Sequence, residues 1–208
     1  MSLDISIPEQ GFTTIDLIRH GHIVHPEYFC APEDEPLSFT GWREMAIATQ
    51  DTHWDQIISS TSARCRCFAS SYARKSTQSL EINKEWREME FGSWVGIDKQ
   101  TIWDNEAPLL HQLWFNPKAF TAPDGESMQG FIERIQDAWE QLQESHAGKK
   151  VLLITHAGAI RVILATALGI SYQETLQFEI AHAHFTRLRV YADGGVSFLG
   201  HGLPKISQ

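Results

Sequence analysis

Two short and almost continuous apolar runs stand out along the chain, at residues 15–18 and 151–155. Runs of this length are typical of strands that are buried on both faces of a parallel sheet. Elsewhere the apolar side chains recur every three to four positions, most clearly over residues 131–142 and 160–168. This spacing predicts two helices that each bury one face.

Other segments add strands to this frame. Residues 56–60 predict a short strand, residues 185–191 alternate like a half-exposed strand, and a turn at 192–195 returns the chain into residues 196–199. Alternating strands and helices predict an α/β fold. We expect a three-layer sandwich, with a mostly parallel central sheet and helices on both faces.

Composition narrows the class of protein. The chain has 208 residues, 42% apolar and 21% charged, with a net charge of −9. We expect one soluble domain over residues 11–208, preceded by a polar segment at 1–10. The acidic balance argues against nucleic-acid binding.

No apolar run approaches the roughly 18 residues of a membrane span, and residues 1–10 do not predict a signal peptide. Three cysteines do not form a disulfide framework, so we expect a cytoplasmic location.

Candidate chemistry begins where the first buried strand ends, at Arg19, His20 and Gly21. Ligands of α/β sheets bind beyond the carboxyl ends of the strands. An arginine presents donors suited to phosphate oxygens, and a histidine can attack phosphorus or carry a proton. Gly21 allows the backbone to approach a ligand closely.

The second buried strand repeats this arrangement, because it ends in His156 and Gly158 before a helix. A histidine at this position faces the anion-binding N-terminus of the helix. Arg64 is predicted in the first turn of another helix, where the dipole disfavours a cation unless an anion binds beside it. On spacing alone, a surface arginine paired with a carboxylate explains Arg64 equally well.

A third stretch, residues 86–96, places Glu88 and Glu90 among aromatic residues and glycines. A carboxyl group in such surroundings suits general acid catalysis. The alternative is a solvated ion pair between Arg87 and Glu90. The residue types alone do not choose between the two glutamates.

These motifs, in this order, resemble the histidine phosphatase superfamily, also called phosphoglycerate-mutase-like proteins. Residues 29–34 are also similar to the loop of its α-ribazole 5'-phosphate phosphatase branch, which serves cobalamin biosynthesis. The resemblance implies a phosphatase without cofactor or metal that hydrolyses a small-molecule phosphomonoester, and it leaves a homodimer open. It implies that His20 is the nucleophile and that Glu88 is the proton donor. It also implies that the phosphate is bound by Arg19, Arg64, His156 and His22.

The chain departs from the family at two positions. The family usually has Thr or Ser where this chain has Ile23, and often Asn where it has Pro26. Two phosphate-binding donors are therefore missing, and His22 or His25 is the candidate replacement. These departures slightly favour a non-catalytic phosphate-binding module, whereas the intact catalytic set argues against one.

Further alternatives stay open. One is a broad-specificity sugar-phosphate or phosphoprotein histidine phosphatase. Another is a metal hydrolase, because His20, His22 and His25 are close in sequence, and His182 and His184 would share a face of a strand. No carboxylate or cysteine cluster with metal-ligand spacing accompanies these histidines, so we favour the phosphatase.

Residues 98–123 form a Trp-rich insert that resembles a lid. Its aromatic side chains either contact an aromatic part of the substrate or pack the insert onto the body of the protein. We favour packing, because aromatic side chains are usually buried. The side chains concerned are Trp103, Leu110, Trp114, Phe115 and Phe120.

Overall fold

The computed structural model describes residues 11–204, so the polar segment 1–10 and residues 205–208 lie outside the described chain. Within it, six strands form one sheet in the order β3-β2-β4-β1-β5-β6. The apolar runs predicted as buried strands lie in β1 and β4 at its centre. The strands are β1 (Phe12–Arg19), β2 (Gln56–Ser59), β3 (Leu80–Ile82), β4 (Lys150–Thr155), β5 (Phe185–Tyr191) and β6 (Val196–Leu203).

The sheet is mostly parallel, as predicted. β4 pairs in parallel with both β1 and β2, and β2 pairs in parallel with β3. β5 is antiparallel to β1 and to β6. The hairpin turn between β5 and β6 contains Gly194, whose φ of +83° is a conformation that favours glycine.

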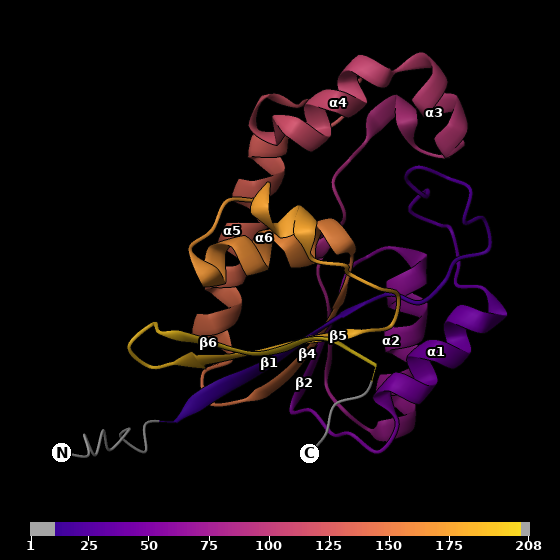
Figure 1. Cartoon of the computed structure of the whole chain (residues 1–208). Helices are drawn as coiled ribbons and strands as arrows, with labels where there is room; N and C mark the ends of the chain where they lie inside the picture. Colours follow the sequence, from indigo (N-terminus) through magenta and orange to yellow (C-terminus); the bar gives the residue numbers. More distant parts are fainter. Residues whose placement is uncertain (1–10, 205–208) are drawn as a thin grey trace.

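Helices cover both faces of the sheet, so the predicted three-layer sandwich is confirmed (Figure 1). In the described residues, no helix is long and apolar enough to cross a membrane. The helices are α1 (Phe39–Thr49), α2 (Ala63–Ser76), α3 (Lys99–Asn105), α4 (Ala107–Phe115), α5 (Met128–Ser145) and α6 (Ala157–Leu168).

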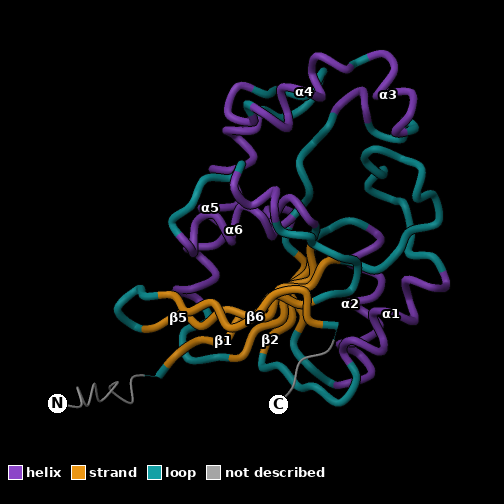
Figure 2. Tube along the Cα trace, viewed as in Figure 1, coloured by secondary structure: helices purple, strands orange, loops and turns teal. Residues whose placement is uncertain are grey.

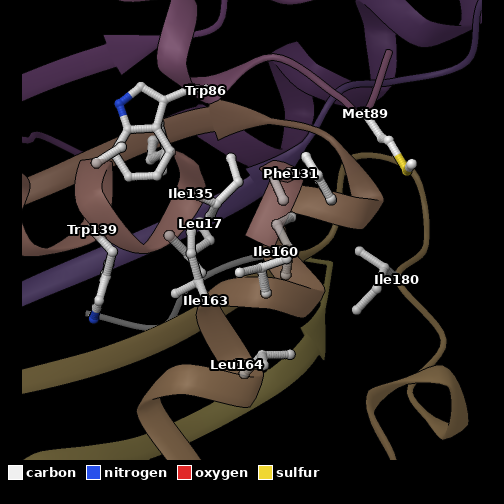
Figure 3. Packing of buried hydrophobic residues seen from close by; sticks show 14 of the residues in the cluster. Leu17, Trp86, Met89, Phe131, Ile135, Trp139, Ile160, Ile163, Leu164 and Ile180 are labelled. Carbon is white, nitrogen blue, oxygen red and sulfur yellow. The ribbon is translucent and has the colours of Figure 1, made fainter. Parts of the chain in front are cut away.

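Successive side chains of β4 point to opposite faces of the sheet, so the hydrophobic core consists of two clusters, one on each face. Val151 and Leu153 pack with residues of α5 and α6, whereas Leu152 and Ile154 pack with residues of α1 and α2. The larger cluster buries the predicted helix faces against the sheet. Figure 3 shows part of it, with Leu17 of β1 among side chains of α5 and α6 such as Phe131, Ile135, Ile160 and Ile163.

Helices α3 and α4 lie beyond the two main helix layers, and the loop after β1 faces α3 (Figures 1 and 2). Backbone hydrogen bonds join this loop to the insert: Phe29 N–H donates to Ile97, and Lys99 N–H donates to Glu27. The loop and the insert therefore stand together over the end of the sheet where β1 and β4 finish.

Candidate active site

A cavity of about 690 Å³ opens at this end of the sheet. It brings together side chains from segments far apart in the sequence, from Arg19 to His182, which agrees with the rule that parallel strands present ligand sites at their carboxyl ends. Its walls include all five residues predicted to be catalytic, Arg19, His20, Arg64, Glu88 and His156.

His20 has one ring nitrogen held by the backbone and the other without a proton. Its Nδ1 lies 2.9 Å from the carbonyl oxygen of Gly21, and a carbonyl only accepts, so Nδ1 carries the proton and Nε2 keeps its lone pair. Burial holds the pKa of His20 well below its ordinary range, and the neighbouring His156, Arg64 and Arg19 lower it further. The imidazole is therefore neutral and free to attack through Nε2.

The glycine after His20 is required by a close backbone approach. A Cβ atom at Gly21 would lie 2.4 Å from the carbonyl oxygen of Gly41 at the start of α1. No side chain fits there without moving the backbone. The loop that holds the His20 ring is thus fastened against α1.

His156 presents one ring nitrogen to the site. Its Nε2 lies 2.8 Å from the hydroxyl of Ser60 and 3.2 Å from that of Ser62. Its Nδ1 is buried and has no partner in the described residues. Burial, with Arg64, Arg19 and Arg134, lowers the pKa of His156. Ser60 Oγ accepts from the N–H of Ser62 at 3.4 Å, so its own hydroxyl proton is available to donate to His156 Nε2. With that hydrogen bond the neutral ring carries its proton on Nδ1, where it is available to a ligand.

The two predicted arginines are held by backbone carbonyls. Arg19 donates from Nη1 to Ile180 at 2.7 Å, and its buried Nε has no partner in the described chain. Arg64, in the first turn of α2, donates to Pro32 at 2.7 Å. Arg64 is only 4% exposed, so the surface ion pair considered for it is wrong. Both side chains line the cavity, where anion binding suits their charge.

The structure also chooses between the two glutamates. Glu88 lines the cavity, and its carboxylate accepts hydrogen bonds from the backbone N–H groups of Met89 (3.1 Å) and Gly158 (3.0 Å). Glu90 is exposed and pairs with Arg87 at 3.0 Å. Glu88 is therefore the one of these two glutamates that lines the cavity, and the solvated ion pair is formed by Arg87 and Glu90.

The positions that depart from the family lie at the cavity wall. Ile23 and Pro26 both line it, so apolar groups stand where donors were expected. His22 also lines the cavity, but its Nδ1 is 2.8 Å from the Glu44 carboxylate, which leaves its Nε2 for a ligand. His25 instead binds Glu35, with Nδ1 3.0 Å from the carboxylate.

Sequence reasoning missed Arg161 as a site residue. Arg161 lines the cavity from α6, donates from Nη2 to Phe178 at 3.0 Å, and has a buried Nη1 without a partner in residues 11–204. Arg161 is the one charged residue in the apolar helix 157–168, and this isolated charge could have identified it as a site residue.

His182 was considered only as a metal ligand. Its Nδ1 lies 3.0 Å from the carbonyl oxygen of His20, and the centre of its ring lies 4.3 Å from that of His22, with the ring planes tilted by 38°. Burial lowers its pKa to about 4. His182 and His184 lie in the turn before β5, so the strand geometry assumed for them is wrong. Among the described residues, no group of three or more histidines, cysteines or carboxylates is arranged to hold a metal ion.

The apolar side chains named for the insert differ in burial. Phe120 and Leu110 are buried, as packing predicts, whereas Phe115 is 65% exposed, so the packing expectation is wrong for it. Trp103 and Trp114 are 63% and 45% exposed and line the cavity. For these two tryptophans the packing expectation is wrong, because the insert projects beyond the core and leaves one side of each ring open.

Comparisons with known proteins agree with this geometry. Residues 15–199 match the family model described as histidine phosphatase superfamily (branch 1). A bifunctional protein of Mycobacterium tuberculosis is 24% identical over 191 residues, which are 89% of this chain and 52% of that protein. This chain thus spans about half the length of that relative.

A solved structure shares the fold. The α-ribazole phosphatase from Shigella flexneri superposes with a TM-score of 0.83 at 18% identity, covering 94% of this chain and 98% of that one. At this identity the match supports the arrangement of strands and helices, and the substrate of this chain has to be argued from its own cavity.

Proposed function

This chain belongs to the histidine phosphatase superfamily, branch 1, and on that premise we propose that it hydrolyses phosphomonoesters through a phosphohistidine at His20. The observation that carries the proposal is the tautomer of His20. Its protonated Nδ1 is held by Gly21, so the unprotonated Nε2 is left to a cavity lined by cations.

In the first step, His20 Nε2 attacks phosphorus in line. A nitrogen–phosphorus bond forms while the bond from phosphorus to the ester oxygen breaks. Glu88, in its acid form, gives its proton to the departing alkoxide, which leaves as an alcohol. Arg19, Arg64 and the Nδ1–H of His156 stabilise the charge on the phosphoryl oxygens.

In the second step, the Glu88 carboxylate takes a proton from water as that water attacks phosphorus. The nitrogen–phosphorus bond breaks, phosphate leaves, and both His20 and Glu88 return to their starting forms. Two fixed guanidinium groups supply the positive charge for both steps. We therefore propose a reaction that needs no metal ion or cofactor.

For the substrate, we propose an alcohol with a planar aromatic group, and α-ribazole 5'-phosphate as the first compound to test. The lining of the cavity also includes aromatic side chains, and a volume of about 690 Å³ accommodates a nucleoside-sized group. Aromatic faces favour flat, apolar partners. The residues that support this are Phe29, Phe91, Trp103, Trp114 and Phe131.

The first experiment is hydrolysis of p-nitrophenyl phosphate in EDTA, with His20→Ala as the control. We expect wild-type turnover to survive EDTA, the variant to be inactive, and acid-labile phosphate to be trapped on the wild-type protein only. Activity that disappears in EDTA would contradict the mechanism. Binding of phosphate without any turnover would support the non-catalytic module instead.

The substrate proposal is tested separately. Wild type is compared with Trp103→Ala on α-ribazole 5'-phosphate and on glycerol phosphate, which has no ring. We expect the variant to lose about 10-fold in kcat/KM on the aromatic substrate and little on the small one. Equal kcat/KM values for both substrates in wild type would favour the broad-specificity phosphatase.

A further inference from the structure

An ion pair behind the Glu88 segment has no role in the chemistry described so far. Arg134 of α5 binds both carboxylate oxygens of Glu126, with Nε 3.0 Å from Oε1 and Nη2 2.9 Å from Oε2. The side chains are 13% and 17% exposed. We propose that this pair positions the Glu88 carboxyl group for proton transfer. The inference rests on the proposed function, since it concerns its general acid.

The guanidinium group also binds the backbone that carries Glu88. Arg134 Nη1 donates to the carbonyls of Glu85 (2.6 Å) and Arg87 (3.2 Å), and Nη2 donates to the carbonyl of Glu88 (3.4 Å). One side chain thus satisfies three carbonyls of a segment that has no strand partner. A segment without a backbone ladder depends on such side chains for its shape.

Glu126 fixes the other side of Glu88. Its carboxylate accepts from the N–H of Glu90 at 3.2 Å, and its own N–H donates to the carbonyl of Glu90 at 2.8 Å. The backbone is therefore held both before and after Glu88. The ion pair ties these two attachments to each other, so that neither moves alone.

Helix α5 carries Arg134 and also contributes a side chain to the cavity. The Arg134 guanidinium lies 5.2 Å from the centre of the Phe131 ring. Phe131 and Glu88 line the cavity, whereas Arg134 and Glu126 are not among its lining residues in the described chain. Arg134 is thus a positioning residue: it binds the backbone that carries Glu88 and does not itself face the substrate.

Leaving-group dependence separates positioning from simple stabilisation. An alkoxide needs a proton to leave, whereas nitrophenolate leaves without one. General acid catalysis contributes about 10²- to 10⁴-fold, and a misplacement of about 1 Å can cost about 10²-fold. A displaced Glu88 therefore slows alkyl phosphates selectively. The value of kcat/KM reports only the steps up to release of the alcohol, so hydrolysis of the phosphohistidine does not enter it.

The experiment compares Arg134→Met, Arg134→Lys and Glu126→Gln with wild type on glycerol phosphate and on p-nitrophenyl phosphate. For Arg134→Met and Glu126→Gln we expect kcat/KM to fall about 10- to 100-fold on the alkyl ester and less than about 3-fold on the aryl ester. Glu88 also activates the water that hydrolyses the phosphohistidine. On the aryl ester, slower hydrolysis of this intermediate should lower kcat and KM by the same factor and leave kcat/KM nearly unchanged. Arg134→Lys should lie between these variants and wild type.

Arg87→Met is the matched control. It removes the arginine that directly precedes Glu88. That side chain is 32% exposed and pairs with Glu90, so we expect both substrates to react as in wild type. Equal loss on both esters in the Arg134 and Glu126 variants, or no loss in a folded variant, would overturn the inference. Wild type that forms no phosphohistidine would overturn the proposed function itself.

Discussion

Replacing Gly158 by alanine should separate activity from stability. Gly158 lies in the first turn of α6, and its N–H donates to Glu88 Oε2. A Cβ atom there would lie 2.2 Å from Glu88 Oε1 and 3.2 Å from the Phe131 ring. Because ordinary contact begins at 3.4 Å, and Phe131 closes the other side, the carboxylate has to move.

The required movement is the difference between 3.4 Å and 2.2 Å, about 1.2 Å. A misplacement of this size costs about 10²-fold in rate. The fold should tolerate the change. Alanine in a helix is better than glycine by about 1 kcal/mol, which partly offsets an overpacking cost of about 1–3 kcal/mol. We expect a change in unfolding free energy within about 2 kcal/mol.

The assay measures kcat/KM on an alkyl and an aryl phosphate, together with urea unfolding. The loss should be larger for the alkyl ester, because the displaced group is the proton donor. Gly130→Ala in the first turn of α5 is the control, since its Cβ would meet the Ser127 hydroxyl at 3.2 Å and Glu126 Cγ only at 4.0 Å. Wild-type kcat/KM in a folded Gly158→Ala protein would refute the placement of Glu88.

Three further predictions concern buried polar groups. Asp16→Asn should lower the urea unfolding free energy by about 3–5 kcal/mol, because fully buried Asp16 accepts from Arg187 at 2.6 and 2.9 Å; a loss below about 1 kcal/mol would contradict this. Ser60→Ala should weaken inhibition by phosphate about 10-fold, since it removes the hydroxyl that fixes the His156 tautomer; unchanged inhibition would count against that role. The pKa of His182 is lowered from 6.5 to about 4, so as pH falls this histidine takes up a proton in the unfolded chain before it does so in the folded protein. The Tm should therefore drop between about pH 6.5 and 4. His182→Gln should make this drop smaller.

The strands that carry His20 and His156 could be predicted from the sequence because a buried strand leaves a local pattern. Each is a short apolar run followed within two positions by a histidine and then by a nearby glycine. The fold class follows from the same local patterns, and the sheet confirms it. These features need no knowledge of distant contacts.

The insert shows where local patterns fail. Trp103 and Phe120 have equally apolar rings, yet one is 63% exposed and the other 1%. Their burial depends on whether another segment lies over them. Phe120 packs against Phe91 and Trp94, whereas Trp103 faces the cavity.

The sequence by itself determined the α/β frame and the family, and it placed His20 and His156 just beyond the ends of two buried strands. Only the tertiary structure decided that Glu88 faces the cavity, that Arg64 is buried beside it, and that Arg161 and His182 complete the walls. Arg134 also binds its carbonyl partners across 46 to 49 positions of sequence. Periodicity reports which face of one element is buried, whereas a hydrogen bond between distant segments depends on how the sheet order brings their ends together.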